Sequence, residues 1–287
     1  MSGNKFSDVI KAAGEEHGFS VKNTKPLSGG DINDVFVIET GSSEKLVIKI
    51  NDAAKYPGMF QAEKAGLDAL RKPEIINVPE TLHVGGTKEY SYLVLKFLES
   101  GSKASGYWKI FGKQMAALHK VSAEKFGFEI DNFIGSLPQY NSEENSAADF
   151  YINQRLEPQF KMASENGYSL GNTDSFLKNC AAIIPNEAPS LVHGDIWNGN
   201  YMTGADGMPV LIDPAVAFAP REMDLAMMKL FGGFDASLFQ SYQEHFPLED
   251  GFEERVALWQ LYYLLVHLNI FGSGYKASVE NILRRYR

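Results

Sequence analysis

The sequence is poor in cysteine and has no excess of basic residues. Its 287 residues include one cysteine, Cys180, so no disulfide can form within the chain, which fits a reducing compartment. Lys and Arg number 27 against 36 Asp and Glu, giving a formal net charge of −9. We therefore expect no nucleic-acid partner, because a phosphate backbone requires a basic face. A nucleotide is still compatible with this charge, since its phosphates can be neutralised locally.

Long apolar runs are also missing. The first residues, MSGNKF, lack the apolar segment of a signal peptide. The longest apolar region, residues 256–271, is interrupted by Gln260, His267 and Asn269, so it predicts a buried core helix and no membrane span. We therefore expect a cytoplasmic protein without a membrane partner. Hydrophobic residues make up 44% of the chain, enough for the core of one large domain or of two lobes.

The most informative segment is residues 191–200, LVHGDIWNGN. Asp195 precedes Asn200 by five positions, and Asp213 follows after the apolar run 210–212. Phosphoryl transfer from ATP requires a carboxylate that orients the attacking hydroxyl, and oxygen ligands that hold magnesium on the phosphates. The spacing predicts Asp195 as the base and Asn200 and Asp213 as the Mg²⁺ ligands. A polar turn between two buried strands is the alternative, which the length of the motif makes less favoured.

A kinase also needs a nucleotide clamp, and residues 26–33, PLSGGDIN, form a glycine-rich turn before a predicted strand. Glycines let backbone N–H groups approach phosphate oxygens closely. We therefore assign ATP binding to Ser28, Gly29, Gly30 and Asp31. The turn lacks the G-x-G-x-x-G pattern, so by itself an ordinary hairpin turn explains it equally well.

A lysine lies inside the next apolar strand, residues 45–50, where alternation places Lys49 opposite Leu46 and Ile48. A buried ammonium needs an anionic partner. Glu63, in the predicted helix 59–71, can supply one, as can phosphate oxygens. We predict a Lys49–Glu63 ion pair that positions ATP. The alternative places Lys49 at an exposed edge and Glu63 on a solvated face.

The order of predicted elements indicates an α+β fold with two lobes of the protein-kinase type. Residues 1–97 form a small β-rich N-lobe with the nucleotide clamp, and residues 98–287 form a larger α-rich C-lobe with the substrate site. Strands are expected within 21–50 and at 78–84 and 90–98, and helices at 6–16, 59–71, 107–119 and 148–165. Nucleotide would bind between the lobes, where the backbone of Lys96, Phe97 and Leu98 would contact adenine.

The chain resembles the fructosamine kinase (ketosamine-3-kinase) family, which is related to the aminoglycoside phosphotransferases. The matching segments are 126–136 (FGFEIDNFIGS), 154–159 (QRLEPQ), 191–200, 213–215, 221–234 (REMDLAMMKLFGGF) and 267–275 (HLNIFGSGY). The resemblance implies ATP with magnesium as donor system. It also implies a ketosamine acceptor such as a fructosamine or ribulosamine, free or on a glycated protein, phosphorylated on a sugar hydroxyl at O3.

Two departures from the family pattern lie at Asp31 and at Ala147–Ala148. Some relatives carry a cysteine at the position we align with Asp31, so a redox switch through that site is not possible here. Relatives tend to have a tryptophan near the position of Ala147–Ala148. Local packing and contact with the substrate would therefore differ here from those in the relatives.

Other residues around the motif have open roles. Trp197 either stacks on the sugar or is a partly buried structural aromatic. Arg221 and Glu222 are candidates for substrate contact, with a salt-bridged scaffold role as the alternative. Asp224 either caps a helix or hydrogen-bonds the 191–200 loop from below. His193 is expected to order that loop, and the histidines expected in the core are His119 and His267.

Alternative functions are an aminoglycoside or choline kinase and a non-catalytic nucleotide- or ketoamine-binding protein. A protein kinase is disfavoured, because no Asp-Phe-Gly or Ala-Pro-Glu motif is present and residues 213–224 leave no room for an activation segment. The intact Asp195, Asn200 and Asp213 argue against a silent binding protein. A polycationic aminoglycoside favours an acidic cradle, but residues 196–202 and 214–220 contain no carboxylate, which favours the ketosamine.

Overall fold

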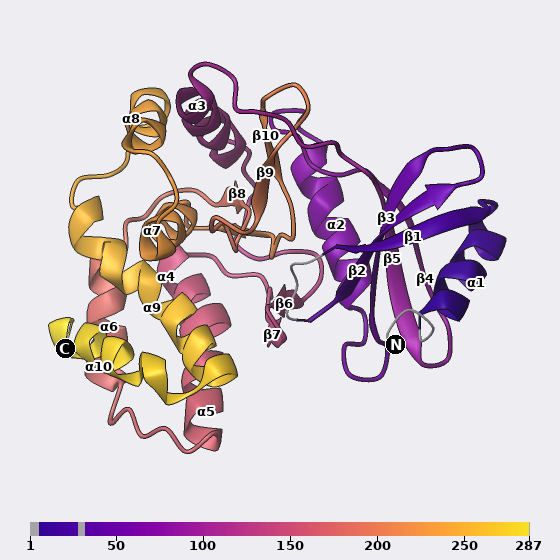
Figure 1. Cartoon of the computed structure of the whole chain (residues 1–287). Coiled ribbons are helices and arrows are strands. Elements are labelled where there is room, and N and C mark those ends of the chain that lie inside the picture. The colour runs from indigo at the N-terminus through magenta and orange to yellow at the C-terminus, as the bar shows by residue number, and fades with distance from the viewer. Residues whose placement is uncertain (1–5, 28–31, 287) are drawn as a thin grey trace.

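The computed structural model describes residues 6–27 and 32–286. Its N-terminal part is a five-stranded antiparallel sheet (Figure 1). In spatial order, the strands are β1 (Val21–Leu27), β2 (Asp34–Thr40), β3 (Lys45–Asp52), β5 (Tyr90–Lys96) and β4 (Thr81–Gly86). The predicted strand at 78–84 therefore begins later, at Thr81.

Two helices cover opposite faces of this sheet, because its central strands alternate apolar side chains between the faces. On β5, Tyr92 and Val94 belong to a core cluster with α1 (Ser7–His17), whereas Leu93 and Leu95 belong to another with α2 (Met59–Arg71). Helix α2 has the predicted bounds. It lies between the sheet and the rest of the molecule, so its side chains can reach both (Figure 1).

The C-terminal part is mainly helical and contains the elements α3 (Tyr107–His119), α4 (Ala147–Asp149), the π-helix η2 (Phe150–Leu156), α5 (Glu157–Glu165), α6 (Asp174–Ile183), α7 (Glu222–Phe231), α8 (Ala236–His245), α9 (Phe252–Phe271), η3 (Ser273–Tyr275) and α10 (Lys276–Arg285). The expected core helix is α9, which is buried along most of its length and begins at Phe252. Within residues 6–27 and 32–286, no helix combines the length and apolarity needed to cross a membrane.

The expected continuous helix 148–165 is divided by a π-helical segment. Pro158 has no N–H to donate to the carbonyl of Gln154, so the regular α-helical bond cannot form there. The Arg155 guanidinium instead donates to this carbonyl at 3.0 Å. The sequence pattern predicted the helical region correctly but not this change in winding.

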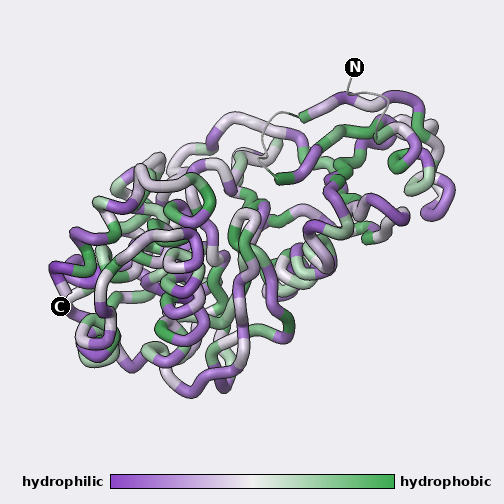
Figure 2. Tube along the Cα trace, turned by 90° about the horizontal axis from the view of Figure 1, so that it is seen from below, coloured by the Kyte–Doolittle hydropathy of each residue, from purple (hydrophilic) through white to green (hydrophobic). Residues whose placement is uncertain are grey.

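Three short antiparallel pairs complete the structure: β6 (Asn132–Ile134) with β7 (Leu137–Gln139), β8 (Ser190–Val192) with β11 (Ala217–Ala219), and β9 (Tyr201–Thr203) with β10 (Pro209–Leu211). The segment between β5 and α3 joins the two parts and is bonded to the β9–β10 hairpin, with Gly101 N donating to Thr203 O at 3.0 Å. Seen from below, the small and large parts lie at opposite ends of the molecule (Figure 2). The boundary between residues 97 and 98 stays a prediction.

Candidate active site

The candidate site is built from two loops that follow strands β8 and β10. The Asp195 loop, residues 193–200, connects β8 to β9, and the Asp213 loop, residues 212–215, follows β10. Backbone hydrogen bonds join the loops: Ala215 N donates to His193 O at 2.9 Å and Ile212 N donates to Asn200 O at 3.0 Å. Residues separated by more than ten positions in the sequence are thereby held together.

Asp195 and Asn200 are in direct contact. The Asn200 amide nitrogen donates to the Asp195 carboxylate at 3.0 Å and to the Asp195 carbonyl at 2.8 Å. Asn200 is buried and Asp195 is half-buried. Because the amide nitrogen is committed to Asp195, the amide oxygen of Asn200 is the atom left to act as a metal ligand.

Lys49 bridges the sheet, helix α2 and the Asp213 loop. Its ammonium lies 2.5 Å from Glu63 Oε1 and also contacts the Asp213 carboxylate. The structure thus forms the predicted Lys49–Glu63 pair and adds Asp213, a partner that the sequence did not predict. Burial alone would lower the pKa of Lys49, but the charges of Asp213 and Glu63 raise it above its ordinary value, so the ammonium stays protonated.

Helix α2 is held against the Asp213 loop by a close approach at Gly66. A Cβ atom at this position would lie 3.2 Å from Val216 Cγ2 and 3.5 Å from Pro214 Cγ. A Cβ atom at this position would require Val216 to shift by a few tenths of an ångström. The spacing explains how Glu63 on α2 and Asp213 reach one ammonium.

The donor set of this site fits a hard divalent cation. In the described part of the chain, no group of three or more His, Cys, Asp or Glu side chains is arranged to hold a metal ion. Magnesium bound together with phosphates requires only one or two protein carboxylates and otherwise keeps water and phosphate oxygens as ligands. Asp213, whose side chain is 45% exposed, and the amide oxygen of Asn200 meet that requirement.

Asp213 itself has an unusual backbone. Its φ is +55°, in the left-handed region that residues with a Cβ atom seldom adopt. A conformation of this kind persists only where the surrounding structure imposes it, and such residues cluster at functional sites.

The Asp195 loop is fixed from below by Asp224 on α7. This buried carboxylate accepts hydrogen bonds from His193 N at 2.8 Å and Gly194 N at 2.9 Å. Of the two roles considered for Asp224, the structure shows the loop contact. Gly194 has φ +83°, and a Cβ there would lie 2.0 Å from Ala215 O, so only glycine fits. His193 orders the loop as expected, its Nε2 lying 2.9 Å from Ile212 O.

His119 is buried as expected, but it does more than fill the core. Its Nε2 lies 3.2 Å from Asp224 Oδ2, and its Nδ1 lies 2.9 Å from the Tyr242 hydroxyl. Burial alone would raise the pKa of Asp224, but the hydrogen bonds from His119 and from Gly194 N lower it, so the carboxylate is ionised. Tyr242 was not singled out from the sequence, since nothing in the local pattern distinguishes it from a core aromatic.

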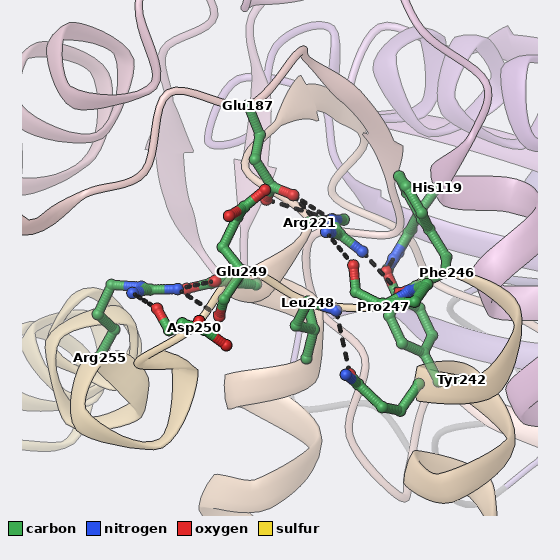
Figure 3. Close-up of polar contacts among 12 residues, drawn as sticks. His119, Glu187, Arg221, Tyr242, Phe246, Pro247, Leu248, Glu249, Asp250 and Arg255 are labelled. Carbon is green, nitrogen blue, oxygen red and sulfur yellow. Dashed lines mark hydrogen bonds and ion pairs between the residues drawn. The ribbon is translucent and has the colours of Figure 1, made fainter.

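Arg221 and Glu222 are buried and paired inside the protein, which favours the scaffold role over the predicted contact with substrate. The Arg221 guanidinium is 2% exposed and pairs with Glu187, whose Oε1 is 3.0 Å from Nε. Glu222 is fully buried and accepts from Arg255 Nε at 2.9 Å and Trp259 Nε1 at 2.6 Å. Buried charges are stable only when paired, so both residues fit a role in the scaffold. Figure 3 shows the contact between Arg221 and Glu187.

Of the predicted adenine contacts, Lys96 already uses its backbone N–H, which donates to Glu80 O at 2.9 Å. This group is therefore not free for adenine. Phe97 and Leu98 follow at the start of the segment that joins the two parts. Ser28, Gly29, Gly30 and Asp31 lie outside the described residues.

Trp197 is 38% exposed on the Asp195 loop, with its ring over Gly199. Beyond the loop, Gly233 lies so close that a Cβ there would be 2.7 Å from Asn198 Cβ. Helix α7 ends just before, at Phe231, which packs on the His267 ring at 4.9 Å between centroids and is 41% exposed. The end of α7 is therefore followed at once by a segment that contacts the Asp195 loop.

Burial also affects the predicted base. It raises the pKa of Asp195 well above the ordinary value, the charges of Asp213 and Asp224 add to this, and the hydrogen bond from Asn200 opposes it. A base must be deprotonated to work, so activity should be lost as pH falls through a value above the ordinary Asp pKa of about 3.9. A profile of kcat/KM against pH, over the range where circular dichroism shows a folded protein, measures this. An acid limb at or below the ordinary Asp value would contradict it.

The fructosamine kinase family model matches residues 4–287 of this chain. A probable ketoamine kinase of Enterococcus faecium is 37% identical over 267 residues, covering 91% of this chain and 94% of the relative. The chloroplastic protein-ribulosamine 3-kinase of Arabidopsis thaliana is 33% identical over 274 residues, covering 91% of this chain and 81% of the relative.

Solved structures agree. A candidate fructosamine-3-kinase from Haemophilus somnus superposes with a TM-score of 0.88 at 28% identity, covering 97% of this chain and 96% of the other. The aminoglycoside phosphotransferase APH(4)-Ia, in complex with ADP and hygromycin B, gives a TM-score of 0.63 at 16% identity, covering 97% and 99%. That likeness shows the shared kinase-like α+β fold. The chain belongs to the fructosamine kinase family and is an ATP-using phosphotransferase of the ketoamine kinase type, with an alcohol group as acceptor.

Proposed function

We propose that this enzyme transfers the γ-phosphoryl group of ATP, with magnesium, to a sugar hydroxyl of a ketosamine, at O3. The observation that carries the proposal is the convergence of Asp195, Asn200 and Asp213 with the Lys49–Glu63 pair. These are the parts that phosphoryl transfer needs, because its catalysis consists mainly of positioning and of charge stabilisation.

Each residue has a distinct task in this proposal. Asp195 orients the acceptor hydroxyl and takes its proton. Asn200 and Asp213 would hold Mg²⁺, which when bound neutralises charge on the phosphates. Lys49 donates to phosphate oxygens and is itself oriented by Glu63.

The nucleotide is proposed to bind between an N-lobe of residues 1–97 and a C-lobe of residues 98–287. The backbone of Phe97 and Leu98 would face adenine. The glycine-rich turn at 28–31 would cover the phosphates.

The surroundings of Asp195 favour an acceptor in which a sugar is carried on an amine. The exposed ring of Trp197 stands on the same loop as Asp195, and a pyranose or furanose ring packs well on such a surface. Phe231 and Phe271, 41% and 56% exposed, form a second exposed aromatic surface, with His267 packed between them. This area could contact the part of a glycated protein around the modified amine. The relatives named as ketoamine and ribulosamine kinases agree with this class of acceptor.

The test is a panel of acceptors assayed for ATP-dependent phosphorylation with and without magnesium. It contains a fructosamine, a ribulosamine, a glycated protein, kanamycin and choline, with Asp195→Ala protein as the blank. We expect magnesium-dependent ADP release with the ketosamines, and phosphate on O3 by ³¹P–¹H correlation. Efficient turnover of kanamycin or choline, with none of the ketosamines, would overturn the proposal.

A further inference from the structure

Three donors converge on the buried carboxylate of Asp224. Two are the backbone N–H groups of His193 and Gly194, and the third is Nε2 of His119. An ionised carboxylate can only accept hydrogen bonds. His119 must therefore present an N–H group at Nε2, and not a lone pair, for this arrangement to be favourable.

The other ring nitrogen of His119 faces the hydroxyl of Tyr242 at 2.9 Å. A neutral imidazole carries one N–H, so with the proton on Nε2 its Nδ1 must accept. The Tyr242 hydroxyl must then donate to Nδ1.

Tyr242 packs beside a fixed neighbour. The centroid of its ring lies 6.4 Å from that of Phe246, and the Arg221 guanidinium stacks on the Phe246 ring.

The position of Arg221 is strongly determined. Its Nη1 and Nη2 donate to the carbonyls of Phe246 and Pro247, both at 2.8 Å, and its Nε donates to Glu187. The guanidinium also stacks on the Phe246 ring, 3.7 Å from the centroid. Figure 3 shows Arg221 between Glu187 on one side and Tyr242 with His119 on the other. Arg221 and Phe246 therefore form a fixed support beside Tyr242.

We propose that Tyr242 is a positioning residue that acts on the Asp195 loop by fixing the Nε2–H tautomer of His119. The hydrogen bonds run in one direction, from Tyr242 through His119 to Asp224, which holds the amides of His193 and Gly194. With the other tautomer, the Nε2 lone pair faces the Asp224 carboxylate and repels it. The inference depends on the proposed function only in taking the Asp195 loop as the catalytic one.

The first measurement is made on the unmodified protein and needs no substrate. Long-range ¹H–¹⁵N correlation spectra of the full-length protein report which ring nitrogen of each of its six histidines carries a proton. A His119→Gln variant assigns the His119 signals. We expect a neutral ring protonated at Nε2. A proton on Nδ1, or on both nitrogens, at neutral pH would overturn the proposal, even if the ketosamine acceptor is correct. If the acceptor panel shows no ketosamine phosphorylation, the measured tautomer of His119 is still valid.

The second measurement uses Tyr242→Phe, which removes only the hydroxyl. We expect mixed tautomers of His119 and faster amide exchange at His193 and Gly194. We also expect kcat to fall about 10- to 100-fold, the cost of a misplaced reacting group, while the KM for ATP changes less than about twofold. The KM is spared because Lys49 and the nucleotide contacts lie outside the chain of hydrogen bonds.

The matched control is Tyr151→Phe. Tyr151 is also fully buried, and its hydroxyl donates to Leu258 O at 2.5 Å, away from the Asp195 loop. This variant loses a comparable buried hydrogen bond, so it should lose similar stability but keep kcat and the His119 tautomer. Equal losses of kcat in the two variants, or an unchanged tautomer in Tyr242→Phe, would show that Tyr242 serves stability alone. If Tyr242→Phe does not fold, the tautomer of His119 measured in the wild-type protein decides whether the proposal holds.

Discussion

Asp195→Ala should abolish turnover while ATP still binds. The Asp195 carboxylate contacts Asn200 on the loop that follows β8, and the Lys49 ammonium that we assign to the phosphates pairs with Glu63 and Asp213 instead. Losing a positioned base costs about 10²- to 10⁴-fold in rate, and the lost orientation of the acceptor hydroxyl adds to this. The measurement combines ketosamine-dependent ADP release with titration of a fluorescent ATP analogue.

Asp195→Asn is the matched control for orientation, because it keeps the shape and can still hold the acceptor hydroxyl. Asp195→Asn should be as inactive in proton transfer as Asp195→Ala, but it should bind the acceptor normally. Thermal unfolding of both variants must match that of the wild type for the result to count. Near-normal turnover by folded Asp195→Ala protein would refute the assignment of the base.

Lys49→Met should have the second largest effect, on turnover and on stability together. The substitution keeps an apolar stem but leaves Glu63 and Asp213 facing each other without the cation. Breaking a buried ion pair by removing one partner costs about 3–5 kcal/mol, and we expect the lower end because Asp213 can turn to solvent. Loss of the charge on the phosphates should lower kcat at least about 10²-fold. Urea unfolding and steady-state kinetics measure the two effects.

Glu63→Gln provides a graded comparison. It keeps a hydrogen-bond acceptor for Lys49 and only weakens its positioning, so the loss of turnover should be smaller than with Lys49→Met. Burial raises the pKa of Glu63 against the opposing effect of Lys49, so the substitution also removes the desolvation cost of a buried carboxylate. A larger loss with Glu63→Gln than with Lys49→Met would contradict the assigned order of roles.

Much of this architecture could be predicted because local pattern and tertiary structure agree. The apolar stripe of residues 59–71 correctly predicted the bounds of α2. The alternation around Lys49 correctly predicted that its ammonium contacts α2. The 191–200 motif likewise brought Asp195, Asn200 and Asp213 together, because strands β8 and β10 end at the same place.

What could not be predicted depends on contacts between distant segments. Arg221 and Glu222 were placed at the substrate because they neighbour the motif in sequence, yet their partners Glu187 and Arg255 lie more than thirty positions away. The contact between Lys49 and Asp213 spans 164 positions. The π-helical turn before Pro158 could have been suspected, since proline removes one donor.

The left-handed backbone of Asp213 sets stability against activity at one position. A non-glycine residue there costs roughly 1–3 kcal/mol, which glycine would recover by removing the Cβ atom. That exchange would also remove the carboxylate that contacts Lys49 and that we assign to the metal. A laboratory selection for heat resistance alone would therefore favour glycine at 213 and discard catalysis, whereas a selection that also demands turnover would keep the aspartate and its strained backbone.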